Sequence, residues 1–365
     1  MKKNSLFRVS LLLVSLAAPV WAQAAEVGRV YTMTNAAAGN EIALFTRAED
    51  GSLALQASIP TGGLGTGAGL GNQSGIAISD DNQWLLVVNA GSDDVSVFAI
   101  TEDGLTLTDR ERSRGDQPVS VALDGNTVYV LNAASSDVQG FQLSRHGTLQ
   151  PLFASKRKLS SDNSGAAQIG FSPDGRTLVV SEKATNTLTS FEVGFGGYLG
   201  KPSFQAATGV TPFGFAFGRR GQLFVTHAEG GAAGASSVGA YHIDSWSKVD
   251  PIDNAVPTFQ AAACWLVVSF DKSFAYSTNP GSNTISGFHI DENGNLELLN
   301  GGVSATLPAG SVTLDMALSD DGEYLYALNS GNGSISGYRI GDDGALLEVG
   351  TFSGLPAGVN GLVAR

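Results

Sequence analysis

The chain has 365 residues, a formal net charge of −13 and a single cysteine. The excess of negative charge opposes binding to nucleic acid or to anionic membrane surfaces, and the lone Cys264 excludes an intrachain disulfide. Glycine is abundant at 47 residues while charged residues make up only 15%, a balance that favours short strands joined by tight turns over helices or disorder.

Residues 1–24 have the three-part layout of a secretory signal peptide. Three cations lie among the first eight residues, an apolar stretch covers 9–18, and small residues end in Ala22-Gln23-Ala24. We therefore expect cleavage after Ala24 or two residues earlier, and a bacterial periplasmic or secreted protein. No later stretch approaches the roughly 20 apolar residues that a spanning helix needs. Residues 25–365 are expected to form one soluble, monomeric domain without membrane insertion.

A repeat of about 50 residues covers this domain. An aromatic residue ends a β-like run in each of seven units: Phe45, Phe98, Phe141, Phe191, Tyr241, Phe288 and Tyr338. Six of the seven are followed six residues later by glycine: Gly51, Gly104, Gly147, Gly197, Gly294 and Gly344. The intervals between the aromatic residues run from 43 to 53 residues, a period typical of propeller blades.

Each unit divides into four short strands, a to d, when Gly and Asp or Asn pairs are taken as hairpin turns. The fourth unit gives strand a at 168–172, strand b at 177–181, strand c at 186–193 and a less regular strand d after Gly197. The seventh unit gives 314–319, 324–328 and 334–340 in the same way. Helical periodicity is absent from residues 25–365.

Seven four-stranded units predict an all-β, seven-bladed β-propeller with antiparallel blades. Residues 360–364 resemble the strand-a pattern of 74–78, whereas the domain starts directly at a strand b with 30–33. The C-terminal strand is therefore expected to complete the first blade and close the ring, which removes an open sheet edge. A tandem of smaller β domains is the competing interpretation, but no linker interrupts the period.

Function in a propeller is usually built where the b-to-c and d-to-a loops share one face around the channel. Alignment on the a strands places seven residues at equivalent positions there: Gly75, Ser120, Gln168, Gly214, Trp265, Asp315 and Gly361. The glycines are expected to leave space, while Ser120, Gln168, Trp265 and Asp315 supply polar groups and one large ring for a small ligand. Alternatively, these polar residues simply line a water-filled channel.

The b-to-c loops carry a recurrent asparagine. The equivalent positions are Asn35, Asn89, Asn132, Glu182, Asn279 and Asn329, with His227 and Glu229 in the longer loop of the fifth unit. Asparagine there suits turn chemistry. Glu182 departs from the pattern, so its carboxylate is a candidate general base or ligand anchor, or else a solvated loop acid.

His227 is the histidine expected on that face. With one histidine per region, no cluster has metal-ligand spacing, so neither a metal nor another cofactor is expected. The glycine-rich stretch beside His227 lies between strands and not at a helix N-terminus, so it is not a phosphate loop. No nucleophile elbow or Ser/His/Asp order is present.

Two segments, residues 171–182 and 212–217, look most like a known family. The whole domain resembles the bacterial seven-bladed propeller lactonases named for 6-phosphogluconolactonase and carboxymuconate cyclase. The resemblance implies hydrolysis of a lactone by an Arg-His pair together with a Glu after strand b. Glu182 matches that Glu, whereas Ala167 and Gln168 stand where the Arg-His pair belongs.

The residues available for a phosphorylated substrate are few. Binding phosphate needs converging Arg or Lys side chains, and the expected face offers Lys183 and the pair at 219–220. Two hypotheses follow. The first is an exported lactonase-like hydrolase in which Glu182 or His227 activates water and Gln168 or backbone amides polarise the carbonyl. The second is a non-catalytic periplasmic propeller that binds a protein, peptide or glycan.

Overall fold

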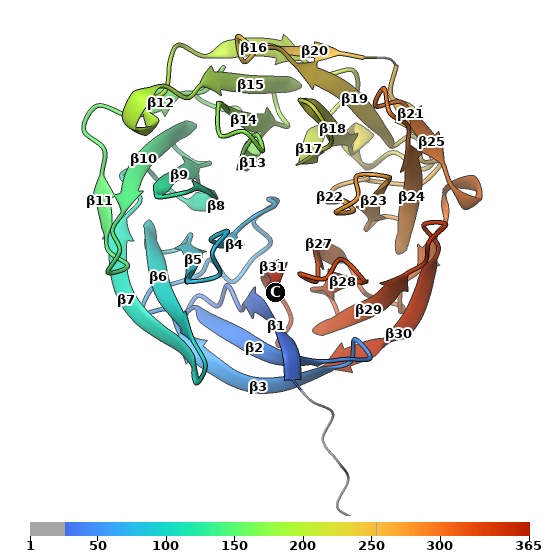
Figure 1. Cartoon of the computed structure of the whole chain (residues 1–365), viewed down its shortest axis with the longest axis horizontal. Helices are drawn as coiled ribbons and strands as arrows, with labels where there is room; N and C mark the ends of the chain where they lie inside the picture. Colours follow the sequence, from blue (N-terminus) through green and yellow to red (C-terminus); the bar gives the residue numbers. More distant parts are fainter. Residues whose placement is uncertain (1–25, 253) are drawn as a thin grey trace, which may run out of the picture.

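The computed structural model describes residues 26–252 and 254–365. They form a closed ring of seven antiparallel sheets around a central channel (Figure 1), which confirms the seven-bladed propeller and rules out the tandem of smaller domains. The expected signal peptide lies outside the described residues. Within those residues, no helix has the length and apolar character needed to cross a bilayer.

Each blade is a sheet whose innermost strand is a and whose outermost strand is d. Blade one consists of β31 (Asn360–Ala364), β1 (Glu26–Met33), β2 (Glu41–Ala48) and β3 (Leu53–Pro60). Blade two consists of β4 (Ile76–Ile78), β5 (Trp84–Asn89), β6 (Asp94–Thr101) and β7 (Gly104–Arg112). Blade three consists of β8 (Pro118–Asp124), β9 (Thr127–Asn132), β10 (Asp137–Leu143) and β11 (Leu149–Pro151), with β12 (Arg157–Lys158) also paired to β10.

Blade four follows the same order with β13 (Ala166–Phe171), β14 (Thr177–Glu182), β15 (Thr187–Glu192) and β16 (Ser203–Ala206). Blade five has β17 (Pro212–Phe217), β18 (Gln222–His227), β19 (Ser237–Ile243), β20 (Val249–Pro251) and β21 (Val256–Pro257). Blade six has β22 (Leu266–Val268), β23 (Phe274–Asn279), β24 (Thr284–Ile290), β25 (Leu296–Leu298) and β26 (Ala305–Thr306). Blade seven has β27 (Thr313–Leu318), β28 (Tyr324–Asn329), β29 (Ser334–Ile340) and β30 (Leu346–Ser353). In the part of the chain that the structure describes, three single-turn 3₁₀ helices lie in connections: η1 (Phe195–Gly197), η2 (Glu229–Gly231) and η3 (Asn300–Gly302).

The ring closes as expected in blade one. β31 pairs antiparallel with β1, with Tyr31 opposite Val363 and Thr32 opposite Leu362. Figure 1 places the C-terminus at the innermost position of this blade. Because β31 covers it, β1 is paired on both sides and is not left as an open edge of the sheet.

The repeated aromatic and glycine residues hold neighbouring blades together. All seven strand-c aromatic side chains are buried, and all six following glycines adopt positive φ, which side chains with a Cβ rarely tolerate. Several also touch the preceding blade: a Cβ on Gly147 would lie 2.2 Å from Trp84, and one on Gly51 would lie 2.3 Å from Tyr324. The glycines recur because the hairpin needs positive φ and because, at all of them except Gly104, strand b of the preceding blade leaves no room for a Cβ.

The recurrent asparagine also has a structural role, in the last position of strand b. The amide nitrogens of Asn89, Asn279 and Asn329 each donate to side chains five and seven residues later on strand c. They therefore tie strand b to strand c instead of adopting left-handed φ. In blade one this position belongs to Met33, which faces Ile42 of β2. The expected equivalence of Asn35 was wrong by two residues, because β1 ends at Met33.

Candidate active site

The blades present two different rims. The loop rim gathers the b-to-c and d-to-a loops, whereas the turn rim gathers the a-to-b and c-to-d hairpin turns. Glu182 and His227 are the last residues of β14 and β18 and pair with the first residues of β15 and β19. They therefore occupy the asparagine position of adjacent blades and lie on the same rim.

Glu182 is fully buried and has a complete set of hydrogen-bond donors. Its carboxylate accepts the Ser160 backbone N–H at 3.3 Å and the Thr185 hydroxyl at 3.0 Å. The hydroxyls of Ser160 and Thr189 donate to it as well. Thr189 lies seven residues after Glu182, so it takes the place of the serine that accepts from asparagine in blades two, six and seven. These contacts favour a structural role for the carboxylate.

His227 is equally buried. Its ring nitrogens lie 3.2 Å from the Ser237 hydroxyl and 3.1 Å from the Tyr241 hydroxyl, and the Tyr241 oxygen also accepts the Thr208 N–H at 2.8 Å. Burial lowers the pKa of His227 to about 4, so the ring is neutral near pH 7. Beside it, the half-buried Glu229 accepts the Val210 N–H at 3.0 Å. The hydrogen bonds of Glu182 and His227 thus end within their own surroundings and do not join the two side chains.

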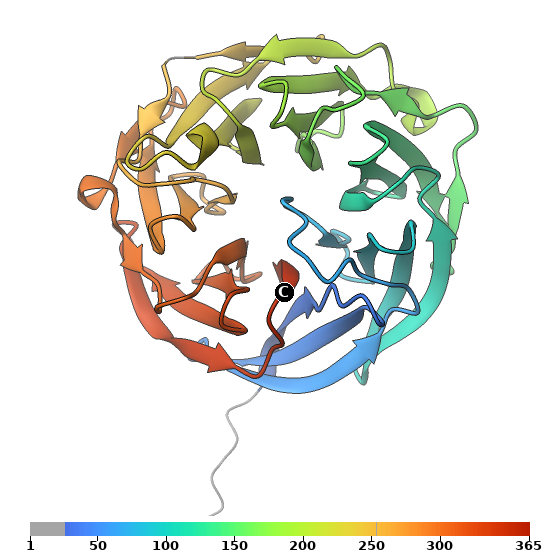
Figure 2. The ribbon, with the colours of Figure 1, turned by 180° about the vertical axis from the view of Figure 1, so that it is seen from behind.

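A strap of residues 70–74 crosses the channel near the loop rim. It ends the connection between β3 and β4, which spans residues 61–75, whereas the other d-to-a connections have five to eight residues. Figures 1 and 2 both show the segment before β4 reaching into the centre of the ring. The strap was not foreseen from the sequence.

Polar groups from three other blades hold the strap. The Gln73 side chain pairs with the backbone of Leu266, accepting at 3.2 Å and donating at 2.9 Å. The Gln73 N–H donates to Ala167 O at 3.1 Å. Trp265 Nε1 donates to Asn72 O at 2.6 Å, and the Asn72 amide nitrogen donates to Val119 O. Blades three, four and six therefore anchor the strap.

The strap occupies much of the space that the sequence assigned to a ligand. Lys183 donates its ammonium to Gly71 O and lies 4.7 Å above the Phe213 ring, and burial lowers the pKa of this lysine to about 8. A Cβ on Gly214 would lie 2.2 Å from Gln73 Oε1. The expected gap at Gly214 is therefore filled by Gln73, and protein atoms likewise fill the space at Gly75 and Gly361.

Two further expected ligand-binding residues link neighbouring inner strands. Gln168 accepts the Phe215 N–H at 2.6 Å and donates to Phe215 O at 3.0 Å, joining β13 to β17. Ser120 Oγ accepts the Ile169 N–H at 3.2 Å, joining β8 to β13. Both side chains are buried, and their hydrogen bonds connect the inner strands of neighbouring blades to one another.

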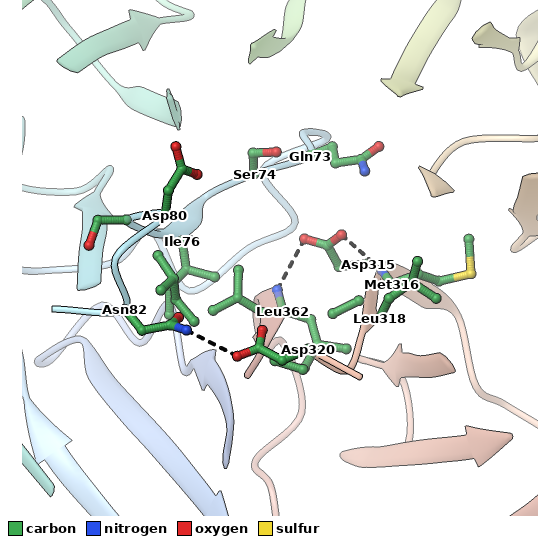
Figure 3. A pocket seen from close by; sticks show the side chains of 15 residues that line it. Gln73, Ser74, Ile76, Asp80, Asn82, Asp315, Met316, Leu318, Asp320 and Leu362 are labelled. Carbon is green, nitrogen blue, oxygen red and sulfur yellow. Dashed lines mark hydrogen bonds between the residues drawn. The ribbon is translucent and has the colours of Figure 1, made fainter. Parts of the chain in front are cut away.

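Asp315 differs from the other expected residues because it lines a cavity. The cavity has a volume of about 440 Å³ and runs along β4, β27 and β31, from Gln73 and Ser74 of the strap to Asp80 and Asp320 at the turn rim. Figure 3 shows the Asp315 carboxylate among these side chains, hydrogen-bonded to Met316 and Leu362. A volume of this size suits a small molecule.

The Asp315 carboxyl is held by backbone N–H groups from two blades. Oδ1 accepts the Met316 N–H at 2.8 Å, and Oδ2 accepts the Leu362 N–H of β31 at 3.1 Å. Burial raises the pKa of Asp315 to about 8, although the N–H groups of Met316, Leu362 and Ser74 act in the opposite direction. A carboxyl poised near neutral pH in a cavity is a candidate acid or base.

No group of three or more His, Cys, Asp or Glu side chains in residues 26–252 and 254–365 has the geometry to hold a metal ion. Cys264 is buried beside the strap, and burial raises the pKa of its thiol to about 12.

The family model for the seven-bladed β-propeller lactonases matches residues 27–159, 124–247 and 234–357. The chain belongs to this lactonase family. Solved propellers share the fold: a candidate 6-phosphogluconolactonase of Bacteroides fragilis has 16% identity and a TM-score of 0.72 over 93% of this chain and 98% of the other. The periplasmic gluconolactonase of Pseudomonas aeruginosa has 15% identity and a TM-score of 0.70 over 91% and 98%.

Sequence similarity to curated relatives is more limited. An uncharacterized Staphylococcus epidermidis protein is 25% identical over 124 residues, which cover 31% of this chain and 34% of the relative. The matched part of this chain thus spans about a third of the length of the curated relatives.

Proposed function

We propose that the protein is an exported hydrolase that opens a lactone of a sugar acid in the cavity lined by Asp315. The single observation that carries this proposal is a deeply buried carboxyl, with a pKa raised to about 8, at the inner end of a cavity of about 440 Å³. Family membership supports the reaction class, and the periplasmic gluconolactonase fold neighbour agrees with export.

In the proposed reaction, the Asp315 carboxylate takes a proton from a water molecule as that water attacks the lactone carbonyl carbon. The tetrahedral intermediate collapses, the ring C–O bond breaks, and the proton on Asp315 passes to the departing alkoxide. The product is an open-chain hydroxy acid. Each Asp315 oxygen accepts one backbone N–H in the free protein, which leaves lone pairs for the water.

Ser74 is the proposed donor to the lactone carbonyl. Its side chain lines the same cavity, and its hydroxyl lies 3.5 Å from Gln168 Nε2, a weak contact that leaves the O–H free to donate. A hydroxyl aimed at the developing oxyanion stabilises the transition state more than the substrate. The contacts of Glu182 and His227, the catalytic candidates from the sequence, favour a structural role for both side chains.

The test is hydrolysis of a panel of aldonolactones by the purified protein, followed by acid release. Asp315→Asn should lower kcat by about 10²-fold or more, the usual size of general-base catalysis, while Asp342→Asn on the exposed turn of the same blade should leave it unchanged. Glu182→Gln and His227→Asn should retain kcat. Full activity of Asp315→Asn would contradict the assignment of Asp315 as the general base. Turnover of no lactone by the unmodified protein would overturn the function and favour the non-catalytic binding propeller.

A further inference from the structure

The cavity has its inner end at the strap and its mouth at the turn rim. Gln73 and Ser74 of the strap line the inner end, and the strap is bonded to blades three, four and six. Asp80 and Asp320 lie at the opposite end, in the a-to-b turns of blades two and seven. A small molecule therefore approaches Asp315 from the turn rim, the rim opposite the one usually used by propellers.

Charge is unevenly distributed over this cavity. Its ionisable lining residues are three acids, Asp80, Asp315 and Asp320, and none of its lining residues is Lys or Arg. Asp80 and Asp320 are exposed. Asn82 Nδ2 donates to Asp320 Oδ2 at 3.0 Å and so joins the two turns at the mouth (Figure 3). This contact fixes the Asp320 carboxylate at the mouth.

More charges surround the mouth. Burial raises the pKa of Asp124, in the next turn of the rim, and the nearby carboxylates of Asp80 and Asp174 raise it further. The acids of neighbouring turns are therefore close enough to repel one another electrostatically. Two cations lie close by: Arg365 Nη1 donates to Asn82 O at 3.4 Å, and Arg29 lines a neighbouring hollow together with Arg365, Asn82 and Asp320. Neither arginine is among the residues that line the cavity, so the only ionisable side chains along the lining are carboxyls.

The geometry points to this acidic mouth as a charge filter that admits uncharged lactones, disfavours phosphorylated ones and speeds release of the anionic product. This inference rests on the proposed lactone hydrolysis. A phosphate monoester carries close to two negative charges at neutral pH, and like charges at short range oppose its approach. Hydrolysis of a neutral lactone turns an uncharged ester into a carboxylate, so the same field favours departure of the product over its return.

The filter is tested by measuring kcat/KM for glucono-δ-lactone and for its 6-phosphate with the full chain. We expect the neutral lactone to be preferred, and the double variant Asp80→Asn/Asp320→Asn to raise the phosphorylated-to-neutral ratio on the order of tenfold. Arg365→Gln should lower that ratio. Asp103→Asn, on an exposed c-to-d turn of the same rim, is the matched control and should leave it unchanged.

Salt provides a second measurement that a merely structural effect of these substitutions would not reproduce. Raising the ionic strength to about 1 M shortens the screening length to about 3 Å and should narrow the preference of the unmodified protein, with little effect on the double variant. Equal turnover of both lactones, or a ratio insensitive to the double variant and to salt, would overturn the filter while leaving lactone hydrolysis intact. Absence of any turnover would overturn both.

Discussion

The carboxylate of Asp315 in blade seven accepts the backbone N–H of Leu362, 3.1 Å away in the C-terminal strand of blade one. The surroundings of Asp315 therefore depend on a seam that forms only when the ring closes: burial raises the pKa of the carboxyl, while the Leu362 N–H acts in the opposite direction. Because β31 packs beside β27, movement of the C-terminal strand would both expose the carboxyl to water and remove one of its donors. Ring closure and the proposed chemistry are thus coupled through a single residue.

Asp315 should make stability depend on pH between about 4 and 8. Its pKa rises from 3.8 in the unfolded chain to about 8 in the folded protein, so the folded state binds the extra proton in this window. Stability is then fully present below pH 4 and falls as pH rises to about 8. The stability of the Asp315→Asn variant should lack this pH-dependent component. The difference in Tm, variant minus unmodified protein, should therefore increase as pH rises from 5 to 8.5. An unchanged Tm difference across the range would show that Asp315 is not the titrating group, with Asp342→Asn as the control.

His227 should act in the opposite direction in acid. Burial lowers its pKa from 6.5 to about 4, so the unfolded state binds more protons between these values and stability falls as pH drops from about 6.5 to 4. The slope attributable to this residue reaches at most about 1.4 kcal/mol per pH unit. His227→Asn, which restores the side chain found in four other blades, should flatten the acid limb of a urea-unfolding series. The same limb in His242→Asn, altered at an exposed histidine of the neighbouring strand β19, should stay steep; matching curves for the two variants would contradict the assignment.

Glu182→Gln should weaken the protein without impairing its proposed activity. The carboxylate accepts from Ser160, Thr185 and Thr189, and a carboxamide offers one oxygen where two were used. Loss of a buried acceptor costs about 1–3 kcal/mol, measurable as a lower urea midpoint. Glu192→Gln, at the exposed end of β15, supplies the comparison. If Glu182→Gln instead kept its midpoint and lost lactone turnover, the carboxylate would have the catalytic role first inferred from sequence.

Cys264 can report on the strap. Its thiol is buried, and the next two residues, Trp265 and Leu266, are bonded to the strap, so a thiol reagent should label the native protein slowly. Gln73→Ala removes both hydrogen bonds to Leu266 and should speed labelling by about tenfold or more, in line with a loss of about 1–3 kcal/mol from the closed state. Gln150→Ala, on an exposed outer strand, should label at the original rate. Equal rates for the two variants would mean that Gln73 does not hold the strap closed.

The fold was accessible from sequence because its determinants repeat. The aromatic residue of strand c and the glycine six residues later recur for local reasons, burial and positive φ, so their spacing predicted seven blades. The pattern shared by 74–78 and 360–364 predicted closure, confirmed by the pairing of β31 with β1. Strand bounds moved by one or two residues: strand a of blade four begins at Ala166 and strand b ends at Glu182.

The site was harder to predict from the sequence because it depends on the strap, which occurs in only one of the connections between blades. Alignment of the blades correctly grouped Asp315 with the channel residues, yet it could not show that the strap fills the space beside Gly214 or that Trp265 and Lys183 bind the strap. One signal was available: the interval from Phe45 to Phe98 is the longest of the six, at 53 residues. The contacts that matter join residues far apart in the sequence, such as Asn72 with Trp265 and Asp315 with Leu362, and no local pattern encodes them.

The join between β1 and β31 also sets the order of events during synthesis. Thr32 and Asn360, whose hydroxyl and carbonyl lie 3.4 Å apart, are separated by 328 positions. A ribosome must therefore deliver six blades before the first can receive its innermost strand, and until then β1 presents an unpaired edge. An emerging polypeptide of this design stays an incomplete arc, exposed to proteases and to pairing with other chains, for nearly its whole period of translation.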